Sequence, residues 1–403
     1  MKILFLSDNF SPEMNAPATR TFEHCREWVK QGVEVTVITC VPNFPKGKVF
    51  DGYRNRLIQT EIIDGIKVVR VWSYISSNSG FLKRIIDYIS FAVMSFLVGL
   101  FYKTDIIVAP SPQFFTTVSG YMLSVFKRKP WVFELRDLWP ESIKAVGAMK
   151  SSKLLDSFEK LELFLYRKAD LIIPVTESFK TNLINRGIDS SKIKVVKNGV
   201  DLEKFKPISK DSSLLEELKL KEKFIVSYIG THGMAHGLSF ILDSIRELDS
   251  HFHFLFIGGG AEKETLVQQA KMSGLTNCTI LDFVSKSEIN KYISIIDIAL
   301  VNLKKSDTFR SVIPSKIFEN AAMRKPILLG VQGESEQIIK SYNAGECFIP
   351  ENKIDFLLKL NLMYNQSSRN TCNYDKGMSA LSADYDRTIL AHSMLNELQL
   401  IIN

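Results

Sequence analysis

The segment Ile313-Pro314-Ser315-Lys316-Ile317-Phe318-Glu319-Asn320, which continues to Pro326, is the stretch around which the rest of the chain is organised. Proline suits the first positions of a helix, and the serine after it can cap the amides exposed there. Lys316 adds a cation beside those amides, so the turn predicts a phosphate site. Glu319 shares a helical face with Lys316, and its carboxylate could accept two sugar hydroxyls. The pair favours a sugar nucleotide; the alternative is a capped surface helix with an ion pair.

Apolar runs separated by helical patterns extend from this segment in both directions. In the first half the strand-like runs are Lys2–Leu6, Glu34–Thr39, Ile66–Trp72, Asp105–Ala109, Pro130–Glu134 and Leu171–Val175. In the second half they are Phe224–Ile229, Phe252–Ile257, Cys278–Leu281, Ile298–Val301 and Ile327–Gly330. Strands that alternate with helices form parallel sheets with right-handed crossovers. The sequence therefore predicts an α/β fold built twice, with a boundary just after the Asn-Gly turn near Asn198.

The composition of the 403-residue chain is that of a soluble globular protein, with 45% apolar and 24% charged residues. Its five cysteines are scattered and form no Cys-x-x-Cys pair. This argues against a disulfide framework or a structural zinc and favours a reducing compartment. The apolar run at the N-terminus stops at Asp8-Asn9, is too short for a signal peptide, and is interpreted as a buried strand.

The net charge of +7 is concentrated in the first half, where residues 1–200 hold 28 Lys and Arg against 19 Asp and Glu. This indicates a polyanionic partner, either anionic lipid or nucleic acid, or simply a solvated basic surface. The most apolar stretch, Ile89–Tyr102, lies in the same half between Lys83-Arg84 and Lys103. It is shorter than the roughly 20 residues that span a bilayer, and it fits either a core helix or a helix in a membrane interface.

Two polar loops of the first half follow predicted strands, where parallel sheets bind their ligands. The loop from Asn9 to Arg20 contains no glycine and is either an acceptor-binding loop or an ordinary connection. Arg136 and Asp137 follow another strand, and they would either meet a substrate or form a structural pair of charges.

The second half has a glycine-rich loop, Gly230–Leu238, between a strand and an amphipathic helix. Glycines let backbone amides approach a phosphate closely. His232 and His236 are too few for a metal site without a third ligand. Each is interpreted as a surface or packing residue, or as a group that binds phosphate or transfers a proton.

Taken together, the motifs resemble glycosyltransferase family 4, of the GT-B fold, over essentially the whole chain. The residues that carry this resemblance are Asn198-Gly199-Val200-Asp201 with Phe205 and Pro207, Gly258-Gly259-Gly260, Asp297 with Leu303, and Pro314-Ser315-Lys316 with Glu319, Ala322 and Lys325-Pro326. Three further segments resemble a bacterial subgroup that builds O-antigen or capsule, and within it an L-fucosamine (N-acetyl-L-fucosaminyl) transferase: Asn15–Arg20, Arg136–Ser142 and Gly230–Leu238.

The resemblance implies two Rossmann-like domains that face each other across a cleft. Residues 1–203, joined by a C-terminal helix at 384–403, would bind the acceptor, and residues 204–383 would bind the nucleotide sugar. The reaction would be a retaining hexosyl transfer, with N-acetyl-L-fucosamine as the expected sugar, from a UDP-sugar to N-acetylglucosamine on undecaprenyl diphosphate. No cofactor, no metal and no nucleic acid are expected. The expected location is cytoplasmic, peripheral on the inner face of the cytoplasmic membrane.

Roles for individual residues follow as hypotheses. The catalytic residues would be Arg136, Asp137 and Lys316, and the acceptor-binding residues Asn15, Arg20 and Trp139. The donor-binding residues would be Gly230, Thr231, Gly233, His236, Phe283, Val284, Arg310, Ser315, Lys316, Ile317 and Glu319. Fixed donors aimed at the leaving diphosphate lower the barrier. The leaving phosphate would take the acceptor's proton, with Asp137 as the fallback base.

The chain departs from the family pattern in three places. Ser311 stands where the first Glu of a Glu-x7-Glu pair is expected, so Glu319 alone remains. The segment Thr231–His236 contains neither of the usual Arg and Lys residues of the phosphate site. Arg136 replaces the usual His. Lys316, helped by Arg310, would have to supply the positive charge.

Other function classes compete with a transferase. A UDP-sugar 2-epimerase of the same fold would share the nucleotide site and consume no acceptor. A non-catalytic sugar-nucleotide-binding protein would fit the missing cations. An NAD oxidoreductase is disfavoured, because neither half has a Gly-x-Gly-x-x-Gly fingerprint followed by a ribose-binding acid.

Overall fold

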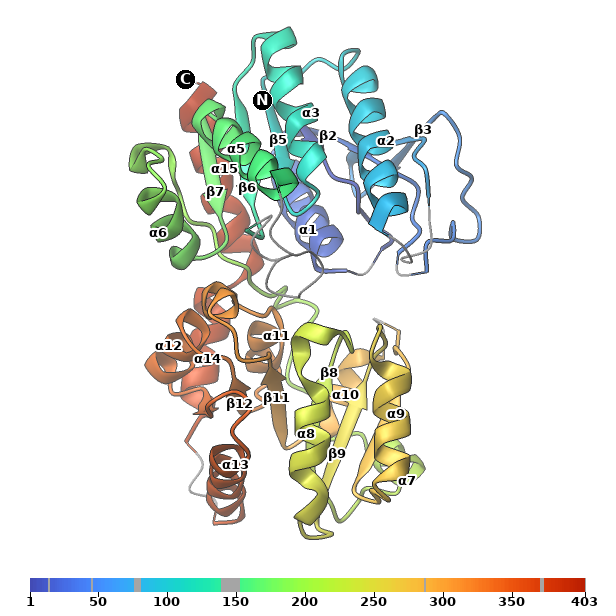
Figure 1. Cartoon of the computed structure of the whole chain (residues 1–403), viewed down its shortest axis with the longest axis vertical. Coiled ribbons are helices and arrows are strands. Elements are labelled where there is room, and N and C mark those ends of the chain that lie inside the picture. Colours follow the sequence, from blue (N-terminus) through green and yellow to red (C-terminus); the bar gives the residue numbers. More distant parts are fainter. Residues whose placement is uncertain are drawn as a thin grey trace. The chain divides into compact units, whose positions relative to one another are not determined.

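The computed structural model describes residues 1–403 except 14, 45, 76–80, 139–152, 286–287, 370–372 and 403. The chain divides into two compact units (Figure 1). The first contains Met1–Asn198 and Arg387–Asn403, and the second contains Gly199–Asp386. The sequence placed the corresponding boundaries at 203/204 and 383/384.

The first unit is built on a seven-stranded sheet in the order β3-β4-β2-β1-β5-β6-β7. Its strands are β1 Lys2–Leu6, β2 Glu34–Thr39, β3 Ile58–Ile63, β4 Ile66–Val71, β5 Ile106–Pro110, β6 Trp131–Leu135 and β7 Leu171–Pro174. All neighbouring strands are parallel except the β3–β4 pair. The sheet order reverses between β1 and β5, so the crevice beyond their carboxyl ends is where such sheets bind ligands.

Helices of the first unit cover this sheet. They are α1 Ala16–Lys30, α2 Phe81–Gly99, α3 Phe114–Lys127, α5 Lys153–Lys168, α6 Glu177–Asn185 and α15 Arg387–Ile402. Alternate residues of β1 enter two separate cores, Leu4 and Leu6 one of them and Ile3 and Phe5 the other. Figure 1 shows α15, in red, among the elements of this unit. Trp28 Nε1 of α1 donates to the Ala391 carbonyl of α15 at 2.8 Å, so the C-terminal helix is part of the first unit's core.

The second unit has a six-stranded, fully parallel sheet in the order β10-β9-β8-β11-β12-β13. Its strands are β8 Phe224–Ile229, β9 Phe252–Ile257, β10 Cys278–Leu281, β11 Ile298–Asn302, β12 Ile327–Gly330 and β13 Gly345–Cys347. Its helices are α7 Ser212–Glu217, α8 Leu238–Ser244, α9 Lys263–Met272, α10 Ile289–Ile295, α11 Lys316–Ala322, α12 Glu334–Tyr342, α13 Lys353–Ser368 and α14 Asp375–Asp384. The order reverses between β8 and β11, and the Gly230 loop follows β8 at this point.

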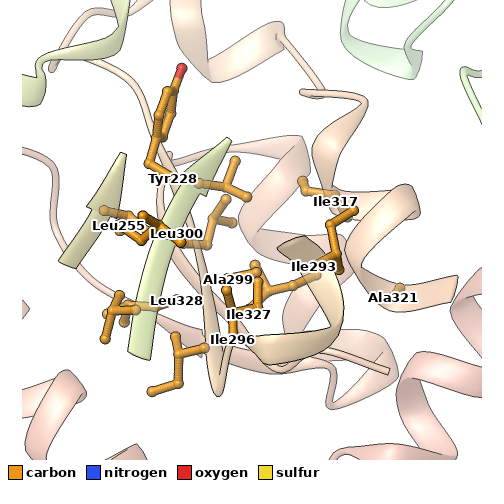
Figure 2. Packing of buried hydrophobic residues seen from close by; sticks show 14 of the residues in the cluster. Tyr228, Leu255, Ile293, Ile296, Ala299, Leu300, Ile317, Ala321, Ile327 and Leu328 are labelled. Atoms are coloured by element: carbon orange, nitrogen blue, oxygen red, sulfur yellow. The ribbon is translucent and has the colours of Figure 1, made fainter. Parts of the chain in front are cut away.

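A single apolar core fills the second unit. Figure 2 shows part of it, where side chains of the central strands meet Ile317 and Ala321 of α11. Tyr228 lies at one end of the drawn cluster, with its hydroxyl directed away from the other labelled side chains. Packing of α11 on this core fixes the position of Lys316, because Ile317 and Phe318 beside it are completely buried.

The predicted α/β fold with two parallel sheets is confirmed. The antiparallel edge strand β3 was missed, because its alternate residues Ile58 and Ile62 are exposed apolar side chains rather than part of a buried run. The final helix predicted from about Asp384 to Ile402 is confirmed as α15, which begins three residues later at Arg387. The preceding helix α14, which ends at Asp384, was not predicted.

Candidate active site

The loop after β8 forms the floor of the candidate site in the second unit. Its backbone is tied to the end of β9, because Gly230 N donates to Ile257 O at 2.8 Å and His232 N donates to Gly259 O at 2.9 Å. Tyr228 Oη donates to the Thr231 carbonyl at 2.8 Å. Both strand ends are thereby held together at the switch point of the sheet, where a ligand is expected.

Glycine is required in this floor because side chains and backbone approach it closely. Gly230 has a φ of +148°, and a Cβ there would lie 2.2 Å from Lys316 Cε and 2.5 Å from its Nζ. A Cβ at Gly258 would lie 1.8 Å from the Gly230 carbonyl oxygen. The bare backbone of Gly230 therefore forms the surface on which the Lys316 side chain rests.

Lys316 supplies a cation at this floor. Its Nζ lies 5.1 Å from the centre of the Tyr228 ring, within the range of a cation–π contact. Among the described residues the ammonium has no hydrogen-bond or ion-pair partner. Burial lowers the pKa of Lys316, and the Glu319 carboxylate opposes that shift. Among the described residues the ammonium is therefore held in place without a direct hydrogen bond or ion pair, and Glu319 is the protein anion that acts on it.

His232 and His236 lie beside Lys316. His232 is fully buried, and neither of its ring nitrogens has a hydrogen-bond partner among the residues that the structure describes. Burial, and next the Lys263 and Lys316 charges, lower the pKa of His232 to about 4. Burial, followed by the Lys316 charge, lowers the pKa of His236 to about 3. Both imidazoles are neutral near pH 7, so Lys316 alone carries charge in this cluster.

The helix start at α11 differs from the predicted cap. Ser315 has helical backbone angles, φ −59° and ψ −25°, and its side chain makes no capping hydrogen bond. A capping serine needs an extended backbone to reach back to the helix amides, so the capping prediction is wrong. The Ile317 amide, predicted to face the diphosphate, donates to the Pro314 carbonyl at 3.1 Å. Arg310 is exposed, 3.7 Å from Asp307.

The remaining predicted donor residues lie around the same floor. Thr231 is exposed and Gly233 half-buried in the β8 loop. A Cβ at Gly259 would lie 2.9 Å from the Phe283 ring, which is 56% exposed, and Val284 packs at the edge of the core. The structure therefore brings the predicted donor residues of the Gly230 loop together with Lys316, and Phe283 with the neighbouring glycine turn.

In the first unit, Arg20 and Arg136 converge on one buried carboxylate. Glu134 of β6 is 2.7 Å from Arg20 Nε and 2.6 Å from Arg136 Nη2. Burial would raise the pKa of Glu134, but the two guanidiniums outweigh burial and hold that pKa below its usual value. Arg20 also donates to the Val196 carbonyl at 2.9 Å, and Arg136 to the Pro17 carbonyl at 3.0 Å. Both guanidiniums are thus committed to protein groups.

The other predicted residues of the first unit have varied surroundings. Asn15 caps α1, since its Oδ1 accepts from the Ala18 amide at 2.9 Å, and its amide group donates to Asn9. Asp137 is half-buried just beyond β6, and its amide donates to Ser111 Oγ at 3.3 Å. Trp139 lies outside the described residues. The acceptor-binding roles of these residues stay predictions.

A group that the sequence did not single out lies at the switch point of the first sheet. Asp8, just beyond β1, is buried, and its Oδ1 has no hydrogen-bond partner within the described ranges. Gln113, after β5, donates to its other oxygen. Burial, with the Asp87 and Glu13 charges, raises the pKa of Asp8 to about 8. The available signal was an acidic residue directly after a buried strand.

Two negative observations complete the description. Within the described ranges, no group of three or more His, Cys, Asp or Glu side chains is arranged to hold a metal ion. Among the helices of those ranges, none combines the length and apolar character needed to cross a bilayer.

Two α/β units with largely parallel sheets are the architecture of the GT-B fold. Residues 18–204 match the family described as Glycosyltransferase Family 4, and residues 211–376 match Glycosyl transferases group 1. The chain is therefore a GT-B glycosyltransferase, with a family 4 domain followed by a group 1 domain.

Similar proteins agree with this class. A putative colanic acid biosynthesis glycosyl transferase WcaI of Escherichia coli K12 is 26% identical over 331 residues, 79% of this chain and 80% of that protein. The structure of HepE from Anabaena in complex with UDP and glucose has a TM-score of 0.73 at 16% identity, covering 99% of each chain. Sucrose-phosphate synthase from Thermosynechococcus elongatus has a TM-score of 0.80 at 13% identity, covering 99% of this chain and 98% of that one.

Proposed function

We propose that the protein transfers N-acetyl-L-fucosamine from its UDP derivative to N-acetylglucosamine on undecaprenyl diphosphate during O-antigen or capsule synthesis. The observation that carries the donor assignment is the Lys316 ammonium, which rests on Gly230 and makes no hydrogen bond or ion pair among the described residues. The name of the WcaI relative supports a role in polysaccharide synthesis, and the UDP and glucose complex of HepE supports a uridine nucleotide.

In this proposal the second unit, residues 204–383 by the sequence boundaries, binds the donor. Lys316 binds the diphosphate, together with the backbone of Gly230, Thr231 and Gly233, and Arg310 assists. Glu319 accepts the ribose hydroxyls, and the backbone at Phe283 and Val284 holds the uracil ring. Cations aimed at the leaving group stabilise charge that develops only in the transition state, so they accelerate transfer rather than merely bind.

The reaction we propose retains the anomeric configuration and uses no metal. The bond between the sugar C1 and the diphosphate oxygen breaks as the acceptor oxygen bonds to C1. The acceptor's proton passes to the departing phosphate, so that UDP leaves and no protein nucleophile is needed. Asp137 is the alternative base.

The first unit, residues 1–203 with the helix at 384–403, binds the acceptor in this proposal. Asn15 and Trp139 are the proposed contacts with the acceptor sugar. The burial of Arg20 and Arg136 against Glu134 suits a different task, because their donors already serve protein groups. We assign these two arginines to positioning the α1 start and the end of β6, between which the acceptor would bind.

Membrane attachment of the first unit is supported by the outer face of α2. Val93, Leu97 and Phe101 on or just after this helix are 50%, 47% and 85% exposed, and Phe126 of the neighbouring α3 is 67% exposed. Exposed basic residues flank this apolar face at both ends: Lys83, Arg84, Lys103, Arg128 and Lys129. An apolar helix face between cations fits an anionic bilayer surface, and we propose docking on the inner face of the cytoplasmic membrane.

Liposome flotation tests this docking face. The double substitution Val93→Glu and Leu97→Glu is expected to release the protein from anionic vesicles, because it places carboxylates among the lipid contacts. Val267→Glu on α9, where Val267 is 44% exposed in the second unit, is the control and should float like the wild type. Equal flotation of all three proteins would overturn the assignment of this face.

The reaction class is tested with a panel of labelled UDP-sugars, each incubated with and without lipid-linked N-acetylglucosamine. UDP release and lipid labelling that require the acceptor, strongest with UDP-N-acetyl-L-fucosamine, are expected. Interconversion of UDP-sugars without acceptor would indicate an epimerase instead. Binding of UDP-sugars without any turnover would indicate a binding protein.

A further inference from the structure

Three basic side chains surround the ring of Tyr228. The Lys316 ammonium is 5.1 Å from the ring centre, and the rings of His232 and His236 have centroids 6.0 Å and 5.7 Å from it. Figure 2 shows Tyr228 at the end of the core cluster, with its hydroxyl end pointing out of that cluster. One buried aromatic ring thus organises two histidines of the β8 loop and the lysine of α11 into one cluster.

This cluster holds more basic groups than the protein satisfies. His232 has no exposed surface, yet within the described part of the chain both of its ring nitrogens lack hydrogen-bond partners. Leaving a buried polar group unpaired costs about 1 to 3 kcal/mol. Among the described residues, no hydrogen bond of the His236 ring is found either. A ligand that reached these nitrogens would therefore satisfy hydrogen-bonding groups that the described residues leave unused.

The charged groups around the cluster are mostly positive. Lys316 faces both histidines, and Lys263 of α9 faces His232 while pairing with Asp282. Glu319 lies near Lys316 and is the anionic group that acts on it. At His236, the backbone carbonyl accepts from Asn302 Nδ2 at 2.8 Å.

An entering diphosphate changes this balance. Without ligand, burial and the lysines keep the histidines neutral, so the cluster carries a single positive charge. A nucleoside diphosphate brings at least two negative charges, and a nearby opposite charge favours the protonated form of a histidine. The phosphate oxygens also provide the acceptors that the buried imidazole nitrogens lack.

We propose that His232 and His236 form with Lys316 a phosphate-binding cluster that takes up a proton when the nucleoside diphosphate binds. His232 thereby becomes a donor-site residue, and the protonated imidazole supplies the second cation in a loop that has no Arg or Lys between Thr231 and His236. This inference rests on the proposed donor site, and it specifies how that site neutralises the diphosphate.

Uptake of a proton on binding makes the affinity for UDP fall as the pH rises. Above about pH 5 both imidazoles of the free protein are neutral, whereas in the proposed complex one of them carries an additional proton. Affinity therefore falls as pH rises between the free and the bound pKa, by up to about tenfold per pH unit for one proton. The terminal phosphate of UDP itself titrates near pH 6, so the test belongs between pH 7 and pH 8.5.

Isothermal titration with UDP, in buffers of different ionisation enthalpy, measures the protons taken up directly. Because a nearby opposite charge shifts a pKa by about 1 to 3 units, the bound pKa of His232 would be at most about 7. Uptake of up to about half a proton at pH 7 is therefore expected, with uptake vanishing and affinity weakening by up to about twofold toward pH 8.5. The substitution of both His232→Gln and His236→Gln should abolish uptake and flatten the pH dependence. His253→Gln is the matched control, since His253 also has a pKa of about 4 but is bonded to Thr279 Oγ1 at 2.9 Å.

The outcomes separate the inference from the proposed function. UDP binding by the wild type without proton uptake overturns the inference and leaves the donor site standing. Uptake that persists in the double variant also overturns it, because the proton then goes elsewhere. Failure of the folded wild type to bind UDP at any pH refutes the donor site itself. The wild-type measurement alone decides the inference if the double variant does not fold.

Discussion

Substitution of Gly230 by alanine tests the geometry of the donor floor most finely. The new Cβ would lie 2.2 Å from Lys316 Cε and 2.5 Å from Nζ, so the end of the lysine side chain must move away. That side chain is flexible, and moving it costs little folding free energy. Strain in the backbone at residue 230 costs more folding free energy than moving the lysine. A φ of +148° is unfavourable by about 1 to 3 kcal/mol for any residue with a Cβ.

The effect on donor binding follows from the displaced ammonium. Loss of a hydrogen bond to a charged group costs about 1.5 to 3 kcal/mol, which corresponds to roughly tenfold to a hundredfold weaker UDP binding. Gly187→Ala in the first unit is the control. Gly187 has a φ of +79°, so an alanine there is also strained, but a Cβ would meet nothing within 4 Å. This control should lose stability and keep its UDP affinity.

A double-mutant cycle with Lys316→Ala separates the ammonium from other effects. UDP titration and urea unfolding are measured on the wild type, the two single variants and the double variant. In the absence of the lysine side chain, Gly230→Ala should lose its effect on UDP affinity while keeping its backbone cost to stability. Additive losses of affinity, or equal losses of affinity in Gly230→Ala and Gly187→Ala, would refute the proposed contact.

Two further predictions concern the first unit. Arg20→Ala should destabilise the protein by about 3 to 5 kcal/mol, because it leaves the buried Glu134 carboxylate with one guanidinium partner instead of two. Urea unfolding measures this loss, with the exposed-site variant Arg54→Ala as the control. Equal urea midpoints for the two variants would contradict the prediction. Burial raises the pKa of the Asp8 carboxyl from its ordinary value of 3.8 to about 8 in the folded protein. The stability that this carboxyl contributes is therefore complete below about pH 4 and declines as pH rises to 8. Asp8→Asn should therefore gain about 2 to 3 kcal/mol on the wild type between pH 6 and pH 8 in urea unfolding, and a pH-independent difference would count against the buried carboxyl.

The features that could be predicted from the sequence are those that depend on residues close to one another in the chain. Strands such as β1 and β8 have their predicted bounds, because each is a short, nearly continuous apolar run that a parallel sheet buries on both faces. Lys316 was singled out because a proline, a serine and a lysine in succession mark a helix start within a few residues. These signals need no knowledge of the distant chain.

Features that depend on tertiary contacts could not be predicted. Lys316 and Gly230 are far apart in the sequence, and no pattern in either segment predicts that they lie close together. Arg20 was expected at an acceptor, but its burial depends on Glu134 in another strand. The complete burial of His232 is likewise a property of the folded sheet, and a histidine in a polar loop is ordinarily expected at the surface.

The most direct test of the central claim compares the wild type with Lys316→Met. UDP release from UDP-N-acetyl-L-fucosamine is measured in the presence and absence of lipid-linked N-acetylglucosamine. The wild type should release UDP only with the acceptor, and Lys316→Met should reduce kcat by about a hundredfold to a thousandfold, as expected when a group that stabilises the leaving charge is lost. Undiminished turnover by a folded Lys316→Met protein would contradict the placement of the leaving diphosphate at Lys316.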